Sequence, residues 1–239
     1  MDVAILSAGE GSRLDLNKQL PKSFINIGKF TILERQLHSL LPHIKNGPLN
    51  ETVNLVLGYG FVGNSSPEAT VRELIDVPEE ISINCLVLPH WGQTENAASA
   101  LAVLPCVRDD LLLLCGDVVF TQSLIGNVTD EYEQSCVPES TSAVAAIEGW
   151  QDEMTSVRWD ENHIVTEYGA IAGHQEAGIF ILNKSHFSKA GERWIDGARS
   201  EWFPVVFEGV TTRAITVSDN EHGEVNTREQ LSEIRRQFV

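Results

Sequence analysis

Short apolar runs alternate with helical patterns over the first half of the chain. Apolar residues at positions 33, 37, 40, 41 and 44 have helical spacing and form one buried stripe. Thr31 and Glu34 have the spacing of a capping box, which predicts the start of this helix, and Asn46-Gly47-Pro48 ends it. The alternation predicts right-handed crossovers and a largely parallel sheet. The other expected elements are strands at 3–6, 52–59, 81–88 and 109–115, and helices at 67–75 and in the alanine-rich segment ending near 101.

The pattern changes after Ser140. Short strands separated by polar turns favour an antiparallel insert at the edge of the sheet; they are expected at 143–147, 155–159 and 164–168. A strand at 212–217 and a helix that Thr227 and Gln230 begin with a second capping box close the chain. The buried face of this helix is expected to carry Leu231, Ile234 and Phe238. We therefore expect an α/β fold with a Rossmann-like central mixed, mostly parallel sheet flanked by helices, and a small antiparallel insert.

Composition narrows the function classes. A chain of 239 residues that is 42% hydrophobic can bury a substantial core as a single domain. Its formal charge of −17 argues against binding to nucleic acid or to anionic lipid. The longest apolar run, 111–115, is too short to span a bilayer, and we expect no membrane partner. The four cysteines show no C-x-x-C spacing, and no signal-peptide pattern is visible, so we expect reduced thiols and a cytoplasmic protein.

The first strand runs into a glycine loop with basic residues. Gly9 and Gly11 would let backbone N–H groups approach an anion closely, and Arg13 and Lys22 add positive charge. The P-loop is excluded because Gly-Lys followed by Ser or Thr is absent, and the dinucleotide fingerprint because Leu14 stands where a third glycine is required. The pattern indicates a phosphate-binding loop; an ordinary glycine turn between a strand and a helix is the alternative.

These residues carry a family resemblance. Leu6-x-Ala8-Gly9-x-Gly11-x-Arg13, followed by Pro21-Lys22, resembles the opening of the nucleotidyltransferases that make nucleoside-diphosphate sugars and related alcohols. The chain is most similar to the sugar-phosphate nucleotidyltransferases and the phosphocholine-type cytidylyltransferases. The resemblance implies a glycosyltransferase-A-like nucleotidyltransferase fold, a bound nucleoside triphosphate and Mg²⁺. The nucleotide-binding residues that it implies are Leu6, Ala8, Gly9, Gly11, Arg13, Thr94 and Asn96.

Some of these assignments have a simpler alternative. Thr94 or Asn96 either caps the alanine-rich helix, contacts the nucleotide, or does both. Asp117 follows a strand at the edge where α/β sheets bind ligands, and the family's Gly-Asp motif uses this carboxylate to hold Mg²⁺; a turn or N-cap role is the alternative. Family members carry Glu-x-Asp-Thr near the C-terminus, where this chain has Asn226. An amide oxygen still coordinates Mg²⁺, but it adds no charge and binds more weakly.

The acceptor side is implied by two further segments. Glu167-Tyr168-Gly169 and Glu176-Ala177-Gly178 resemble family segments that line the acceptor pocket. The resemblance therefore assigns acceptor binding to Glu167, Gly169, Glu176 and Gly178. The two glutamates either accept hydrogen bonds from acceptor hydroxyls or face solvent. The tryptophans are expected to serve packing, unless several converge on one point as a cage for a choline-type ligand.

The resemblance implies transfer of a nucleotidyl group from a nucleoside triphosphate to a phosphorylated acceptor, with release of pyrophosphate. The acceptor is a sugar 1-phosphate or a phospho-alcohol such as phosphocholine, and a homo-oligomer stays open. Arg13, Lys22 and Asp117 are expected to be catalytic, and Asp117 and Asn226 to hold Mg²⁺. Within one domain over 1–239, the expected parts are nucleotide-binding 1–139, acceptor-binding 140–210 and a closing strand and helix in 211–239.

Two other functions stay open. A glycosyltransferase of the same broad architecture (GT-A type) would usually show Asp-x-Asp, whereas Asp117 is followed by Val118 and Val119. A catalytically weakened nucleotide- or sugar-phosphate-binding relative is favoured by Asn226. The sequence does not identify the base or the acceptor.

Overall fold

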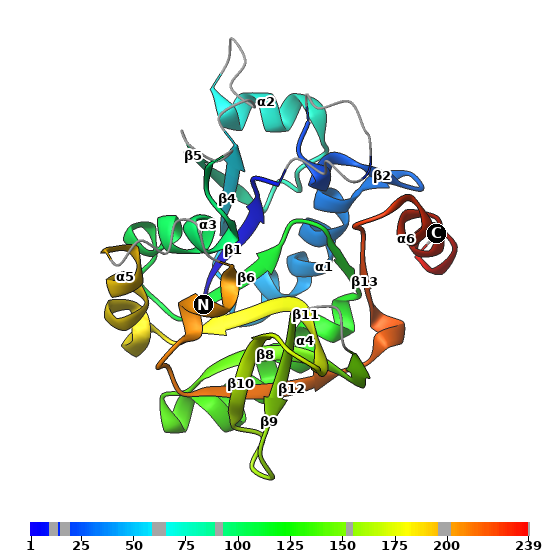
Figure 1. The fold of residues 1–239 in the computed structure, drawn as a ribbon. Helices are drawn as coiled ribbons and strands as arrows, with labels where there is room; N and C mark the ends of the chain where they lie inside the picture. The colour runs from blue at the N-terminus through cyan, green and yellow to red at the C-terminus, as the bar shows by residue number, and fades with distance from the viewer. Residues whose placement is uncertain are drawn as a thin grey trace.

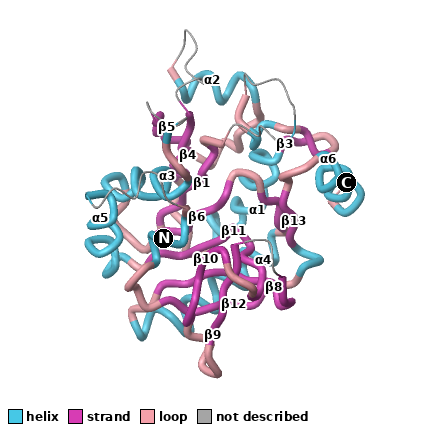
Figure 2. The backbone as a smooth tube through the Cα atoms, in the orientation of Figure 1, coloured by secondary structure: helices cyan, strands magenta, loops and turns pink. Residues whose placement is uncertain are grey.

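A mixed sheet organises the fold. The computed structural model describes residues 1–9, 14, 20–58, 66–88, 93–151, 155–195 and 202–238. Within them, nine strands form one sheet with helices on both faces (Figures 1 and 2). Its first half confirms the expected parallel pairing: β1 pairs with β4 and β6, and β4 pairs with β5. These strands are β1 (Asp2–Ser7), β4 (Thr52–Gly58), β5 (Ser82–Leu88) and β6 (Leu111–Cys115).

The expected antiparallel region continues this sheet. β11 pairs antiparallel with β8 along one edge and with β6 and β9 along the other, and β10 extends β9. β12 returns late in the chain to pair in parallel with β8. The strands are β8 (Ser142–Gln151), β9 (Thr155–Trp159), β10 (Val165–Ala170), β11 (Gly173–Leu182) and β12 (Thr212–Val217).

Successive side chains of the central strands point alternately into two hydrophobic cores. Along β1, Val3 and Ile5 enter one core, while Ala4 and Leu6 enter the other. The run 111–114 is at most 1% exposed, so both faces of β6 are covered, as its all-leucine sequence predicts. One core is covered by α1 (Ile32–Asn46), α2 (Pro67–Leu74) and α4 (Gln122–Glu131), and the other by α3 (Asn96–Val103) and α5 (Phe187–Ile195).

A small third core joins the two ends of the chain. It contains Ile27, Val119, Val225 and Ile234. The pairing of β7 with β13 and the hairpin of β2 with β3 supply its walls, together with α6. These elements are β2 (Asn26–Ile27), β3 (Phe30–Thr31), β7 (Val118–Phe120), β13 (His222–Glu224) and α6 (Arg228–Gln237). The C-terminal segment therefore lies against the segment that follows β6.

Both predicted capping boxes are confirmed, and the helix expected at 67–75 begins at Pro67. Thr31 and Glu34 form a capping box at α1, and Thr227 and Gln230 form one at α6. At α3 neither Thr94 nor Asn96 is the N-cap: that position is Glu95, whose side chain makes no capping hydrogen bond. The Glu95 carbonyl instead accepts a hydrogen bond from the Ala98 N–H, at 3.1 Å.

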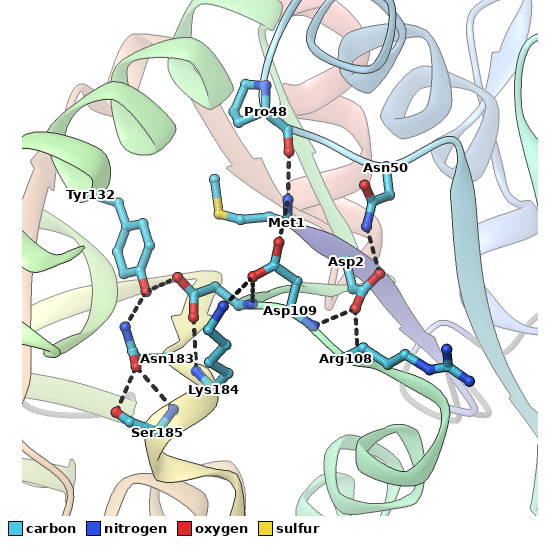
Figure 3. Close-up of polar contacts among 11 residues, drawn as sticks. Met1, Asp2, Pro48, Asn50, Arg108, Asp109, Tyr132, Asn183, Lys184 and Ser185 are labelled. Atoms are coloured by element: carbon cyan, nitrogen blue, oxygen red, sulfur yellow. Dashed lines mark hydrogen bonds and ion pairs between the residues drawn. The ribbon is translucent and has the colours of Figure 1, made fainter.

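A polar network closes the end of the sheet where β1 and β6 begin (Figure 3). The Asp2 carboxylate accepts hydrogen bonds from the backbone N–H groups of Arg108 and Asp109, at 2.7 and 2.9 Å, and from the Asn50 side chain at 2.8 Å. Burial opposes ionisation of Asp2, but these donors bring its pKa below the ordinary value. The network fixes the N-terminus against the strand starts, opposite the end where ligands bind in sheets of this kind.

None of the described helices is long and apolar enough to cross a membrane. The four cysteines, all in the described ranges, are free thiols.

Candidate active site

Two turns meet where β1 and β6 end. Because the strands are parallel neighbours, the turn after Ser7 and the turn at Gly116-Asp117 lie at one edge of the sheet. The Gly116 N–H donates to the Leu6 carbonyl, at 3.0 Å. A Cβ on Gly116 would lie 2.7 Å from that same oxygen, so only glycine allows this approach. The close contact fixes where Asp117 emerges from the sheet.

Lys22 reaches this turn from the N-terminal loop. Its Nζ donates to Oδ2 of Asp117 at 2.7 Å and to Oδ1 of Asn226 at 2.5 Å. The Lys22 side chain is only 12% exposed, so the ammonium is largely shielded from bulk water. Three segments that are far apart in sequence therefore converge on one nitrogen atom.

β13 and the two residues that follow it form the C-terminal arm of the site. The buried His222 ring bonds through Nε2 to the Ala177 carbonyl at 2.9 Å, and burial lowers the pKa of His222. The Val225 N–H donates to the Asp117 carbonyl at 2.9 Å, which ties this arm to the turn after β6. The Asn226 amide nitrogen donates to Glu224, so its oxygen is turned toward Lys22.

A cavity of about 410 Å³ opens beside this cluster. The start of α3 forms one wall, and the positive end of a helix dipole favours a negatively charged ligand. Of the residues that the structure describes, none has an atom within 4 Å of a Cβ built on Gly9. Seven of the predicted site residues line the cavity: Leu6, Ala8, Gly9, Lys22, Thr94, Asn96 and Asp117. Gly11 and Arg13 lie outside the described residues.

The oxygen atoms at this point suit a hard cation. Asp117 and Asn226 each direct one oxygen at the ammonium of Lys22, so a Mg²⁺ bound by these two oxygens would have to displace the ammonium from that position. Carboxylate and amide oxygens are ligands that Mg²⁺ prefers. The described residues contain no group of three or more His, Cys, Asp or Glu side chains arranged to hold a metal ion. A Mg²⁺ held by Asp117 and Asn226 would therefore need further ligands from substrate phosphates or water.

Glu176 faces this cluster from β11. Burial raises the pKa of Glu176 to about 8, and the nearby charges of Glu224 and Asp117 raise it too, while a hydrogen bond donated by the Tyr168 hydroxyl opposes the shift. This shift favours the protonated form of the Glu176 carboxyl group at neutral pH. In that form it donates a hydrogen bond, a capacity that a carboxylate lacks.

The four predicted acceptor residues do not come together. Glu167 is exposed and pairs with Arg158 on the neighbouring strand, whereas Tyr168, the next residue, turns the other way to reach Glu176. Glu167 and Gly169 line a second cavity of about 560 Å³. Gly178 has a φ of +65°, and a Cβ there would lie 2.8 Å from Cγ1 of Val118. A side chain at position 178 would therefore collide with Val118.

Sequence reasoning missed two residues at the site. Tyr168 lies between the two predicted glutamates, but sequence alone does not show which face of β10 meets the site. Gln36 is a polar residue on the buried stripe of α1, and its side chain bonds to the backbone around Asp117. A lone amide among Leu33, Leu37 and Leu40 was the available signal.

The comparisons with known proteins identify the fold. No protein-family model and no curated protein matches the chain. Among solved structures, CTP:phosphocholine cytidylyltransferase from Streptococcus pneumoniae is 12% identical with a TM-score of 0.72, covering 100% of this chain and 99% of that one. The inositol-1-phosphate CTP transferase from T. maritima is 16% identical with a TM-score of 0.78, over 99% and 94%. UDP-glucose pyrophosphorylase complexed with UDP-glucose is 13% identical with a TM-score of 0.74, over 99% and 97%. The chain therefore has the nucleotidyltransferase fold, as its sequence resemblance implied.

Proposed function

We propose that this protein transfers a nucleotidyl group from a nucleoside triphosphate to a phosphorylated sugar or alcohol and releases pyrophosphate. The observation that carries the proposal is the convergence of Lys22, Asp117 and Asn226 beside the cavity at the ends of β1 and β6. The similar structures named above include enzymes that act on phosphocholine and on inositol 1-phosphate, which supports this reaction class.

In the proposed reaction, an acceptor phosphate oxygen attacks the α-phosphorus of the triphosphate. A new P–O bond forms, the bond from the α-phosphorus to the bridging oxygen breaks, and pyrophosphate leaves with that electron pair. The acceptor phosphate is already ionised at neutral pH, so the site needs no strong general base. Catalysis then rests on positioning and on charge neutralisation.

Different residues of this chain would supply the positioning and the charge neutralisation. The backbone at Gly9 and the start of α3 face the triphosphate, and we assign Gly11 and Arg13 to its β- and γ-phosphates from the sequence. Lys22 bridges the α-phosphate and the attacking phosphate, which reduces the repulsion between the two anions. Asp117 and Asn226 would hold Mg²⁺, which when bound supplies further positive charge. Protonated Glu176, supported by Tyr168, faces the acceptor as a hydrogen-bond donor.

The direct test is pyrophosphate release with a panel of triphosphates and acceptors. The panel pairs ATP, CTP, GTP, UTP and dTTP with glucose 1-phosphate, inositol 1-phosphate and phosphocholine. One productive pair that gives pyrophosphate and the nucleotide-linked product supports the proposal. A separate incubation with a sugar nucleotide tests the glycosyltransferase alternative, which release of a nucleoside diphosphate would indicate.

A second candidate is a nucleotide-binding protein with weak or no turnover. It is favoured by Asn226, whose neutral amide replaces a charged metal ligand. Calorimetric binding of a triphosphate together with a silent pyrophosphate panel would select this candidate and reject the proposed transferase.

A further inference from the structure

One glutamine side chain connects α1 to both ends of the turn that carries Asp117. Gln36 is 1% exposed, and its Nε2 donates to the Cys115 carbonyl and to the Val118 carbonyl, each at 2.8 Å. These two carbonyls flank Gly116-Asp117. A single amide group therefore bridges the turn.

The same helix is bonded to the segment that carries Lys22. The Ile32 N–H, at the start of α1, donates to the Ile25 carbonyl at 3.0 Å, and the Ile25 N–H donates to the Lys22 carbonyl at 3.1 Å. The N-terminus of α1 is thus tied to Lys22, and its second turn is tied to Asp117 through Gln36. This arrangement sets the two charged groups relative to one helix.

Packing alone does not explain a glutamine at this position. Leu33, Leu37 and Leu40 are fully buried on the same side of α1, so an apolar residue would suit the core. Among the described residues, Oε1 of Gln36 is buried and accepts no hydrogen bond. An orphaned acceptor is unfavourable in a core, so the two donated bonds are what this side chain adds.

We propose that Gln36 is a positioning residue that holds the Asp117 turn against Lys22, and so sets the geometry in which the site binds triphosphate and metal. The inference rests on the proposed function for its ligand. Gln36 touches neither ligand; it acts through the backbone of residues 115–118.

The test compares three variants with the wild-type protein. Gln36→Met keeps a long side chain and removes both donors. Gln36→Glu keeps the shape but donates only while its carboxyl group is protonated. Ser39→Ala is the matched control, because Ser39 donates from the same helix to the Phe120 carbonyl at 3.0 Å, at the far end of β7 from Asp117.

Triphosphate and Mn²⁺ affinities are measured by calorimetry for each folded variant, with melting temperatures alongside. We expect Gln36→Met to weaken both affinities by about tenfold or more, as for other supporting partners of a metal ligand. Ser39→Ala should stay within about twofold. Relative to wild type at the same pH, Gln36→Glu should recover affinity as the pH is lowered from 7.5 to 5.5, whereas Ser39→Ala should show no such trend. If Gln36→Met does not fold, the comparison with the wild-type protein is made with Gln36→Glu instead.

A second readout needs no ligand. Amide hydrogen exchange should rise at residues 116–118 in Gln36→Met and stay unchanged there in Ser39→Ala. Unchanged exchange at these amides would overturn the inference, as would affinities within twofold of wild type. Failure of the pyrophosphate panel would reject the proposed function but not this role, because exchange and binding judge Gln36 separately.

Discussion

The ammonium nitrogen of Lys22 lies 2.7 Å from Oδ2 of Asp117, although 95 residues separate the two in sequence. The exposed fractions of their side chains are 12% and 26%, so the pair is less screened than an ion pair on the surface. In a chain of formal charge −17, this contact places a positive charge beside the cavity at the strand ends. A phosphate group approaching that cavity meets a cation already held in position.

Replacement of Lys22 tests this relationship. Lys22→Met keeps much of the side-chain length but removes the charge that would meet the phosphates. We expect pyrophosphate release to fall by about 10²- to 10³-fold, as for loss of one donor to a developing anion. Lys184→Ala is the control, since Lys184 is an exposed lysine paired with Asp109 at the opposite end of the sheet. Turnover within about twofold of wild type would contradict the role of Lys22.

Local sequence patterns predicted the two elements next to Lys22 and Asp117, namely α1 and β6. The all-leucine run fixed β6 as a buried central strand, and the spacing of Thr31 and Glu34 marked the start of α1, because both signals lie within a few residues. The capping alternative for Thr94 or Asn96 is wrong, because Glu95 is the N-cap of α3 and its backbone carbonyl, not a side chain, accepts the Ala98 N–H.

Long-range geometry could not be predicted in the same way. Gln36 bonds to carbonyls 79 and 82 residues away, and Lys22 bonds to an amide 204 residues away. Strand alternation shows that Glu167 and Tyr168 face opposite ways, but which of them faces Glu176 depends on how the sheet packs. The catalytic, acceptor and metal roles stay predictions.

Asn226→Asp tests the weakened metal site. A second carboxylate beside Asp117 adds the charge that a hard cation favours, so we expect Mn²⁺ and Mg²⁺ affinity to rise by about tenfold. The control is Asn220→Asp, which adds the same charge at an exposed position in the segment Asp219–Glu221. Calorimetric titration with each metal measures the effect. Equal affinity in wild type and Asn226→Asp would exclude residue 226 as a ligand.

Two glycine substitutions separate ligand binding from stability. Among the described residues, a Cβ on Gly9 would meet no atom within 4 Å, so Gly9→Ala should leave the melting temperature unchanged and weaken triphosphate binding on the order of tenfold, which corresponds to about 1.4 kcal/mol. A Cβ on Gly116 would clash with the Leu6 carbonyl, so Gly116→Ala should lower the free energy of unfolding by about 1–3 kcal/mol. Denaturant unfolding and calorimetry measure the two quantities. A destabilised Gly9→Ala, or one that binds triphosphate normally, would contradict the phosphate-facing role.

The raised pKa of Glu176 predicts how the free energy of unfolding depends on pH. Its pKa in the folded protein is about 8, against an ordinary value of 4.5, chiefly because the group is buried. Between these values the folded protein keeps a proton that the unfolded chain has released, so this contribution to stability is fully present below pH 4.5 and is lost as the pH rises toward 8. Glu176→Gln cannot lose this proton. Its free energy of unfolding relative to wild type should therefore rise between pH 5 and pH 8, with an upper limit of about 1.4 kcal/mol per pH unit.

Urea unfolding at several pH values checks this slope. Glu167→Gln is the matched control, because Glu167 lies on the exposed side of β10 in an ion pair with Arg158, and its difference from wild type should show no such rise. Groups that titrate equally in both proteins cancel in each difference. A flat difference for Glu176→Gln would mean that Glu176 is ionised at neutral pH, and it would then meet an acceptor as a negative charge rather than as a hydrogen-bond donor.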